Sequence, residues 1–258
     1  MQALAAPSDP RQGPAASALF AECPTYRFCK PAKWPGSEPD ATTAQLLWDR
    51  ENLYILYHVE GSFAPAISVD QCEPSVLDAL LRDYTDPTQV VNASFADAGF
   101  QRTILLDDRC EVFVQPVLPG VPFQRYYALE INRDGRAITN INNSVVSRAF
   151  DRSWDASAAY TARFSESDQT LLVTLRWAEM GISPGQTEVN IGLFRAQKPA
   201  PLAAKTIGAI DMSIMSMVNA EMMWSAWRDP GDDVVDFHRS AFLGELKLLP
   251  PLPKHAKI

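Results

Sequence analysis

The stretch TAQLLWDRENLYILYHVE, residues 43–60, carries the pattern that decides the fold. Two runs of alternating residues flank the polar residues DREN at 49–52. Side chains in a strand point to alternate faces, and polar residues of this kind favour turns, so the stretch predicts a β-hairpin. In the second strand one face is entirely apolar or aromatic: Leu53, Ile55, Tyr57 and Val59.

A second hairpin is predicted from DDRCEVFVQ, residues 107–115. From Cys110 the run alternates, so Cys110, Val112 and Val114 share one face and Glu111 lies on the other with Phe113 and Gln115. The other predicted strands are 110–117, 123–132, 159–164, 171–177, 188–195 and 244–249. Strands joined by turns predict an all-β fold, an antiparallel β-sandwich of the lectin or jelly-roll type.

Two insertions interrupt the strands, so we expect one or two short helical insertions in the sandwich. Residues 74–86 place their apolar side chains on one helical stripe, and residues 212–227 are rich in Met and Trp. The predicted organisation is an extended N-terminal arm over 1–42, the β-sandwich domain over 43–249 and a C-terminal tail over 250–258.

Composition excludes several classes of function. Of 258 residues, 31 are acidic and 23 basic, a net charge of −8, and no basic cluster is visible. Phosphate binding needs clustered Lys and Arg, so we expect no nucleic-acid partner. The sequence has no apolar run long enough for a transmembrane helix, so we expect no membrane partner either. The start MQALAAPSDPRQGPAAS lacks the basic and apolar blocks of a secretory signal, which favours the cytoplasm, with a removed signal as the alternative.

The four cysteines are at Cys23, Cys29, Cys72 and Cys110, without C-x-x-C spacing. This argues against a structural zinc site. Four free thiols are the simpler interpretation for a cytoplasmic protein, and a Cys23–Cys29 disulfide is the alternative for a secreted one.

Five motifs now occur in one order over residues 43–249: LLWDRENLYILYHVEG, DDRCEVFVQP, YYALEINRDGR, NIGLFRAQ and DFHRSAFLGELKL. Together they resemble the carbohydrate-binding family 9-like domains, which are DOMON-like β-sandwiches. The resemblance implies a non-catalytic carbohydrate-binding protein with a saccharide ligand held by loop aromatics and carboxylates.

What the resemblance implies about single residues applies only at positions where this sequence matches the family's motif. Sugar-binding members hold the sugar between two tryptophans, and these positions fall here on Leu105 and Phe237. The polar ligand-binding residues that the resemblance implies on neighbouring strands fall here on Ala128 or Gly192. The positions that match the broader pattern are Asp108, Glu111, Phe113, Asn190, Arg195, Phe237, His238, Arg239 and Gly244. Part of the sugar clamp is therefore replaced.

The predicted ligand-binding residues are Phe237, His238, Trp224, Trp227, Asp108, Glu111, Arg195 and Arg239. Carboxylates such as Glu111 accept strong hydrogen bonds from sugar hydroxyls, and the alternative is an internal ion pair with Arg195 or Arg239. The tryptophans could form a sugar platform or cap the sandwich core.

We expect no cofactor. Asp107 and Asp108 could ligate calcium, as could residues 232–233, although no dense run of alternating acids supports either. A haem would need an axial pair such as Met217 or Met222 with His238, which we do not expect. No catalytic motif is present, and the pair His238 and Asp236 is the candidate for acid–base chemistry. The alternative function is a small-molecule enzyme or carrier with a more apolar pocket on the same scaffold.

Overall fold

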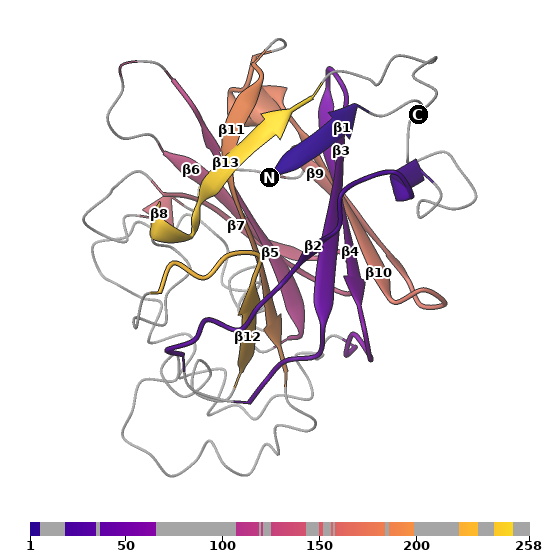
Figure 1. Ribbon diagram of the computed structural model, residues 1–258. Coiled ribbons are helices and arrows are strands. Elements are labelled where there is room, and N and C mark those ends of the chain that lie inside the picture. The colour runs from indigo at the N-terminus through magenta and orange to yellow at the C-terminus, as the bar shows by residue number, and fades with distance from the viewer. Residues whose placement is uncertain are drawn as a thin grey trace, which may run out of the picture.

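The computed structural model forms a β-sandwich built from two sheets (Figure 1). The residues that it describes are 1–5, 19–34, 37–65, 107–118, 120, 125–142, 150–151, 156, 158–183, 186–198, 222–231 and 240–249. The predicted antiparallel sandwich is confirmed: nearly all neighbouring strands pair antiparallel.

The first sheet contains most of the C-terminal strands. Its order is β8 (Phe150–Asp151), β7 (Ala137–Asn142), β6 (Tyr126–Asn132), β5 (Arg109–Pro116), β11 (Glu188–Gln197) and β13 (Gly244–Leu248). The short strand β12 (Met223–Ala226) also pairs with β11. The predicted strands at 110–117, 123–132, 188–195 and 244–249 correspond to β5, β6, β11 and β13.

The second sheet contains the hairpin on which the fold prediction rests. Its strands are β2 (Tyr26–Arg27), β3 (Thr42–Trp48), β4 (Asn52–Val59), β10 (Thr170–Arg176) and β9 (Tyr160–Ser165). In the β3–β4 turn, Asp49 Oδ1 accepts hydrogen bonds from the backbone N–H groups of Glu51 at 2.8 Å and Asn52 at 2.7 Å. This Asp-centred turn is the physical reason why DREN ends one strand and starts the next.

Strand β1 (Gln2–Ala5) joins the two sheets along one edge. It runs parallel to β13 through Gln2 and Ala3, and parallel to β3 through Leu4 and Ala5. In Figure 1 it lies beside β13 in indigo and yellow. Strands β1 and β2 thus belong to the segment predicted as an N-terminal arm.

The main core lies between the sheets and follows the predicted alternation. The second strand of the hairpin contributes Leu53, Ile55, Tyr57 and Val59, and β5 contributes Cys110, Val112 and Val114. All seven side chains are buried. The inward direction of Cys110 is therefore confirmed, and burial raises the pKa of its thiol, which makes it a poor nucleophile.

Helical structure in the described residues is short: Leu19 and Phe20 are α-helical, and η3 (Ala178–Met180) and η4 (Ser240–Phe242) are 3-10 turns. The helix predicted at 74–86 lies outside the described residues. No described helix is long and apolar enough to span a bilayer. Cys23, Cys29 and Cys110 are free thiols, so the Cys23–Cys29 disulfide is not formed, and Cys72 lies outside the described residues.

Candidate functional site

The candidate site lies where two strands meet end to end on one edge of β11. Strand β12 pairs with residues 194–197 of β11, and β13 pairs with residues 188–191. At the joint, the backbone N–H of Trp227 donates to the carbonyl of Leu193 at 3.1 Å.

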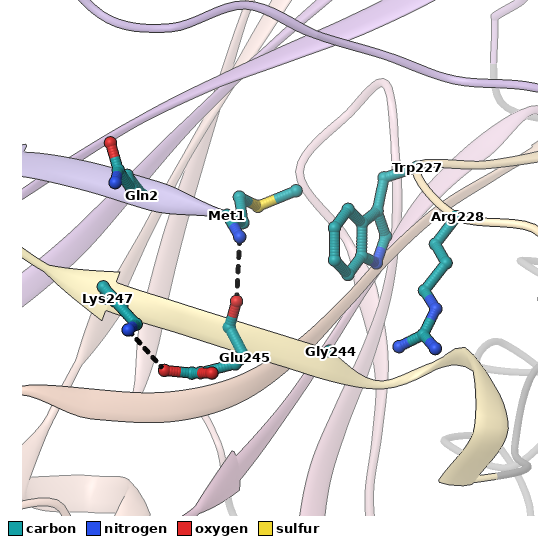
Figure 2. Close-up of a pocket in the computed structure, with 7 residues that line it drawn as sticks. All are labelled: Met1, Gln2, Trp227, Arg228, Gly244, Glu245 and Lys247. Carbon is teal, nitrogen blue, oxygen red and sulfur yellow. Dashed lines mark hydrogen bonds and ion pairs between the residues drawn. The ribbon is translucent and has the colours of Figure 1, made fainter.

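Beside this joint lies a pocket of about 520 Å³, which we call the edge pocket (Figure 2). Its lining comes from β1, the end of β12 and β13: Met1, Gln2, Trp227, Arg228, Gly244, Glu245 and Lys247. Pockets that bind small molecules typically have volumes of about 300–1,000 Å³. The edge pocket is therefore large enough for one or two sugar rings.

Trp227 is the aromatic wall of the edge pocket. The ring is partly buried and packs against the main core. Its edge lies on Gly244, where a Cβ atom would come within 2.6 Å of the ring atoms Cζ2 and Cη2. The indole Nε1 is buried and has no hydrogen-bond acceptor among the described residues. The absence of a side chain at Gly244 therefore allows the Trp227 ring to lie this close to β13.

Polar groups line the rest of the edge pocket. Arg228 Nη1 donates to the carbonyl of Leu243 at 3.1 Å. On β13, Lys247 Nζ lies 3.3 Å from Glu245 Oε1, and both side chains are about half exposed. In Figure 2, Trp227 and Arg228 lie on one side of the pocket, and Glu245 and Lys247 on the other. The edge pocket thus combines an aromatic ring with charged donors and acceptors.

The close contact between Gly244 and the Trp227 ring can be tested by substitution. Gly244→Ala places a methyl group inside the contact distance of Trp227, and overpacking of this kind typically costs about 1–3 kcal/mol. We expect a lower midpoint of chemical denaturation together with a shifted tryptophan emission. Lys247→Ala on the same strand, with an exposed side chain, should change stability by less than about 0.5 kcal/mol. Unchanged stability and emission in Gly244→Ala would show that the ring is not held there.

Two predicted site residues, Asp108 and Arg195, form a buried ion pair between the sheets. Arg195 Nε and Nη2 donate to Asp108 Oδ1 at 3.1 Å and Oδ2 at 2.9 Å, and Nη1 donates to Thr42 Oγ1 at 3.2 Å. The backbone N–H of Ala64 also donates to Asp108 at 3.1 Å. Burial raises the pKa of Asp108, and the charge and hydrogen bonds of Arg195 oppose that rise. These contacts satisfy both charges within the protein.

Glu111 lies on the opposite face of the same sheet from Arg195 and does not pair with it, and Arg239, the other arginine expected for it, lies outside the described residues. It pairs in register with Glu130 on β6, so the two carboxylates are direct cross-strand neighbours. Arg109 lies between them: Nη2 is 3.0 Å from Glu111 Oε1, and Nε is 3.0 Å from Glu130 Oε2. All three side chains are buried. An arginine two residues before Glu111 therefore supplies the counter-charge.

Trp224 lies in a second buried cluster on this outer face, separate from the edge pocket. It meets Trp34 edge to face at 6.1 Å between ring centroids, and the guanidinium of Arg109 lies 5.4 Å from its ring. Met222 is buried in the same cluster. Of the two predicted tryptophans, Trp227 lines a pocket and Trp224 packs against other aromatic rings.

Several predicted residues lie outside the described part of the chain, so their roles stay predictions. They are the aromatic and polar candidates Phe237, His238 and Arg239, the acids Asp236 and residues 232–233, and Met217. Asp107 is described, and its Oδ2 accepts from Asn132 Nδ2 at 2.9 Å. Within the described ranges, no three His, Cys, Asp or Glu side chains gather as a metal site would require.

Sequence reasoning missed Arg228, Glu245 and Lys247 as pocket residues. In GELKL the polar residues Glu245 and Lys247 alternate with buried Leu246 and Leu248, so their outward direction could have been predicted. Their meeting with Trp227 could not, because it depends on the end-to-end arrangement of β12 and β13 along β11.

No protein-family model and no curated protein sequence matches the chain. Among solved structures, the chain is similar to a carbohydrate-binding module of family 9 from Caldicellulosiruptor kristjanssonii in complex with glucose. The identity is 9%, the TM-score is 0.47, and the match covers 100% of this chain and 99% of the other.

A second similar structure is the family 9 module from Caldicellulosiruptor kristjanssonii in complex with cellotriose. Here the identity is 10%, the TM-score is 0.47, and the match covers 100% of this chain and 98% of the other. Similarity of this degree carries no argument about function, which therefore rests on the pocket itself.

Proposed function

We propose that this protein binds carbohydrate, without catalysing a reaction, and that the edge pocket is the binding site. The observation that carries the proposal is the indole ring of Trp227 in a pocket whose other walls present Arg228, Glu245 and Lys247. A sugar ring needs this combination, because one of its faces presents C–H groups and its rim presents hydroxyl groups.

The aromatic ring supplies the first part of the binding energy. The face of an indole carries negative partial charge, which attracts the weakly positive C–H groups of a sugar ring. The carboxylate of Glu245 can accept from hydroxyl groups, and Arg228 and Lys247 can donate to them. The proposal is consistent with the sequence resemblance, with Trp227 in place of the tryptophan that is missing from the expected clamp.

Affinity should be modest, because the described pocket has one aromatic wall. We expect a dissociation constant on the order of 0.1–1 mM, which corresponds to roughly 4–5.5 kcal/mol. Trp227→Ala should weaken binding about tenfold or more, since truncation of an aromatic anchor typically costs more than about 1 kcal/mol. Titration calorimetry with neutral mono- and oligosaccharides measures this directly, alongside the change in tryptophan emission on binding.

Trp227→Phe is the matched control, because it keeps an aromatic face and should retain most of the affinity. Thermal unfolding of each variant separates lost binding from lost folding. The proposal would be overturned if no saccharide binds even at high millimolar concentration. Tight binding of an apolar metabolite in the same experiment would support the alternative of a small-molecule carrier or enzyme.

A further inference from the structure

The charges around the edge pocket differ in sign from the charge of the whole chain. The protein carries 31 acidic and 23 basic residues. The side chains that line the edge pocket include two cations, Arg228 and Lys247, and one anion, Glu245. A site with excess positive charge on an acidic protein favours an anionic ligand over a neutral one.

Arg228 is the cation whose charge has no acidic partner in the part of the chain that the structure describes. Its one hydrogen bond, from Nη1 to the carbonyl of Leu243, fixes the orientation of the guanidinium and uses one of five N–H groups. The adjacent Asp229 forms no ion pair with Arg228 in the described structure, and its carboxylate accepts hydrogen bonds from the backbone N–H groups of Ala32 at 2.9 Å and Gly231 at 2.8 Å.

The second cation is arranged differently. Lys247 already pairs with Glu245 at 3.3 Å, so its charge is compensated, and it is about half exposed. The planar fork of arginine matches a carboxylate through two parallel hydrogen bonds, which an ammonium group does not provide. Arg228, next to the aromatic ring, is therefore the group that would recognise a carboxylate.

We infer that the ligand of the edge pocket is an acidic saccharide, with the sugar ring on Trp227 and its carboxylate on Arg228. The inference rests on the proposed carbohydrate-binding function and names the class of saccharide. A uronic acid unit has this chemistry, since its carboxylate is attached to the ring carbon next to the ring oxygen. A sulfate ester on the sugar would present a similar charge and is distinguished by the test.

The test compares ligands that differ only in the acid group. Calorimetric titrations use methyl glucopyranoside against methyl glucopyranosiduronate, neutral galactose oligomers against oligogalacturonate, and glucose 6-sulfate. We expect the uronates to bind about tenfold more tightly than their neutral counterparts, and the sulfate to fall between them, because bidentate charged hydrogen bonds are the stronger kind. Raising the salt concentration should weaken only the acidic ligands.

Variants assign the effect to one side chain. Arg228→Gln should remove the advantage of the uronates and weaken neutral sugars much less, because the glutamine amide can still donate to a hydroxyl group. Arg228→Lys should keep part of that advantage. Arg176→Gln, an exposed arginine at the end of β10, makes the same change in net charge and should have no effect. Thermal unfolding confirms that each variant is folded.

The outcomes distinguish failure of the acidic-saccharide inference from failure of the proposed carbohydrate-binding function. Equal binding of neutral and acidic sugars, or an equal loss of both in Arg228→Gln, would overturn the acidic-saccharide inference and leave carbohydrate binding in place. Preference for the sulfate over the uronates would also overturn it. Binding of no saccharide at all would overturn the proposed function itself.

Discussion

Asp108→Asn is expected to destabilise the protein by about 3–5 kcal/mol, because removal of one partner from a buried ion pair leaves the other charge uncompensated. Arg195 is fully buried, and its guanidinium makes two of its hydrogen bonds to Asp108. Asparagine keeps the shape of the side chain and supplies one acceptor oxygen in place of two. Chemical denaturation at neutral pH measures the loss, which corresponds to roughly 10 °C in melting temperature for a domain of this size.

Two further variants test whether the charge is the cause. In Asp108→Asn combined with Arg195→Met, no unpaired charge remains, so part of the lost stability should return. The ion pair between Arg133 and the exposed Glu166 provides the matched control, because Glu166→Gln should cost at most about 1 kcal/mol. Equal stability of Asp108→Asn and the wild type would mean that Arg195 finds another partner, and a ligand role for Asp108 would then regain support.

The strand pattern explains why Arg195 has this partner. On β11 it continues the inward-facing series Val189, Ile191 and Leu193, and it pairs in register with Cys110 on β5. Glu111 is one residue further along β5, so its side chain faces the other way. With β11 and β5 in this register, the alternation in EVNIGLFR places Arg195 and Glu111 on opposite faces of the sheet. A direct Arg195–Glu111 pair, one of the alternatives open from the sequence, is therefore excluded.

The fold was predictable from the sequence wherever strands are long and adjacent in the chain. The hairpin at residues 43–60 is confirmed as β3 and β4, because its alternation and its Asp49 turn are both local signals. Strand β1 was not predicted, because its four residues carry no alternation and its partners, β3 and β13, lie far away in the chain.

The site was predictable only in part for the same reason. Trp227 was predicted as a ligand-binding residue because its segment, residues 212–227, is rich in Met and Trp. In the structure its ring lines the edge pocket. The polar groups beside it come from β13 and depend on Gly244, whose missing side chain admits the ring. No local sequence pattern predicts the contact between Trp227 and Gly244, because it depends on how β12 and β13 both pair with β11.

Arg109→Gln is the second change with a large expected effect, and it acts on the outer face of the same sheet. Glu111 and Glu130 are directly opposite on β5 and β6, and like charges in such cross-strand positions repel. Arg109 lies 3.0 Å from each carboxylate and compensates that repulsion in a buried setting. Its removal takes away a counter-charge that two neighbouring buried carboxylates share, and we expect a loss of about 3–5 kcal/mol in the free energy of unfolding.

Three comparisons identify the source of that loss. Arg109→Gln combined with Glu111→Gln should be more stable than Arg109→Gln alone, because the facing carboxylates no longer repel each other. Arg109→Lys keeps the charge but cannot bridge both carboxylates through one planar group, so it should have intermediate stability. Glu111→Gln alone should cost less than Arg109→Gln, since Arg109 and Glu130 remain paired. If instead Glu111→Gln costs as much as Arg109→Gln, Glu111 has a structural role beyond this triad, and the repulsion argument fails.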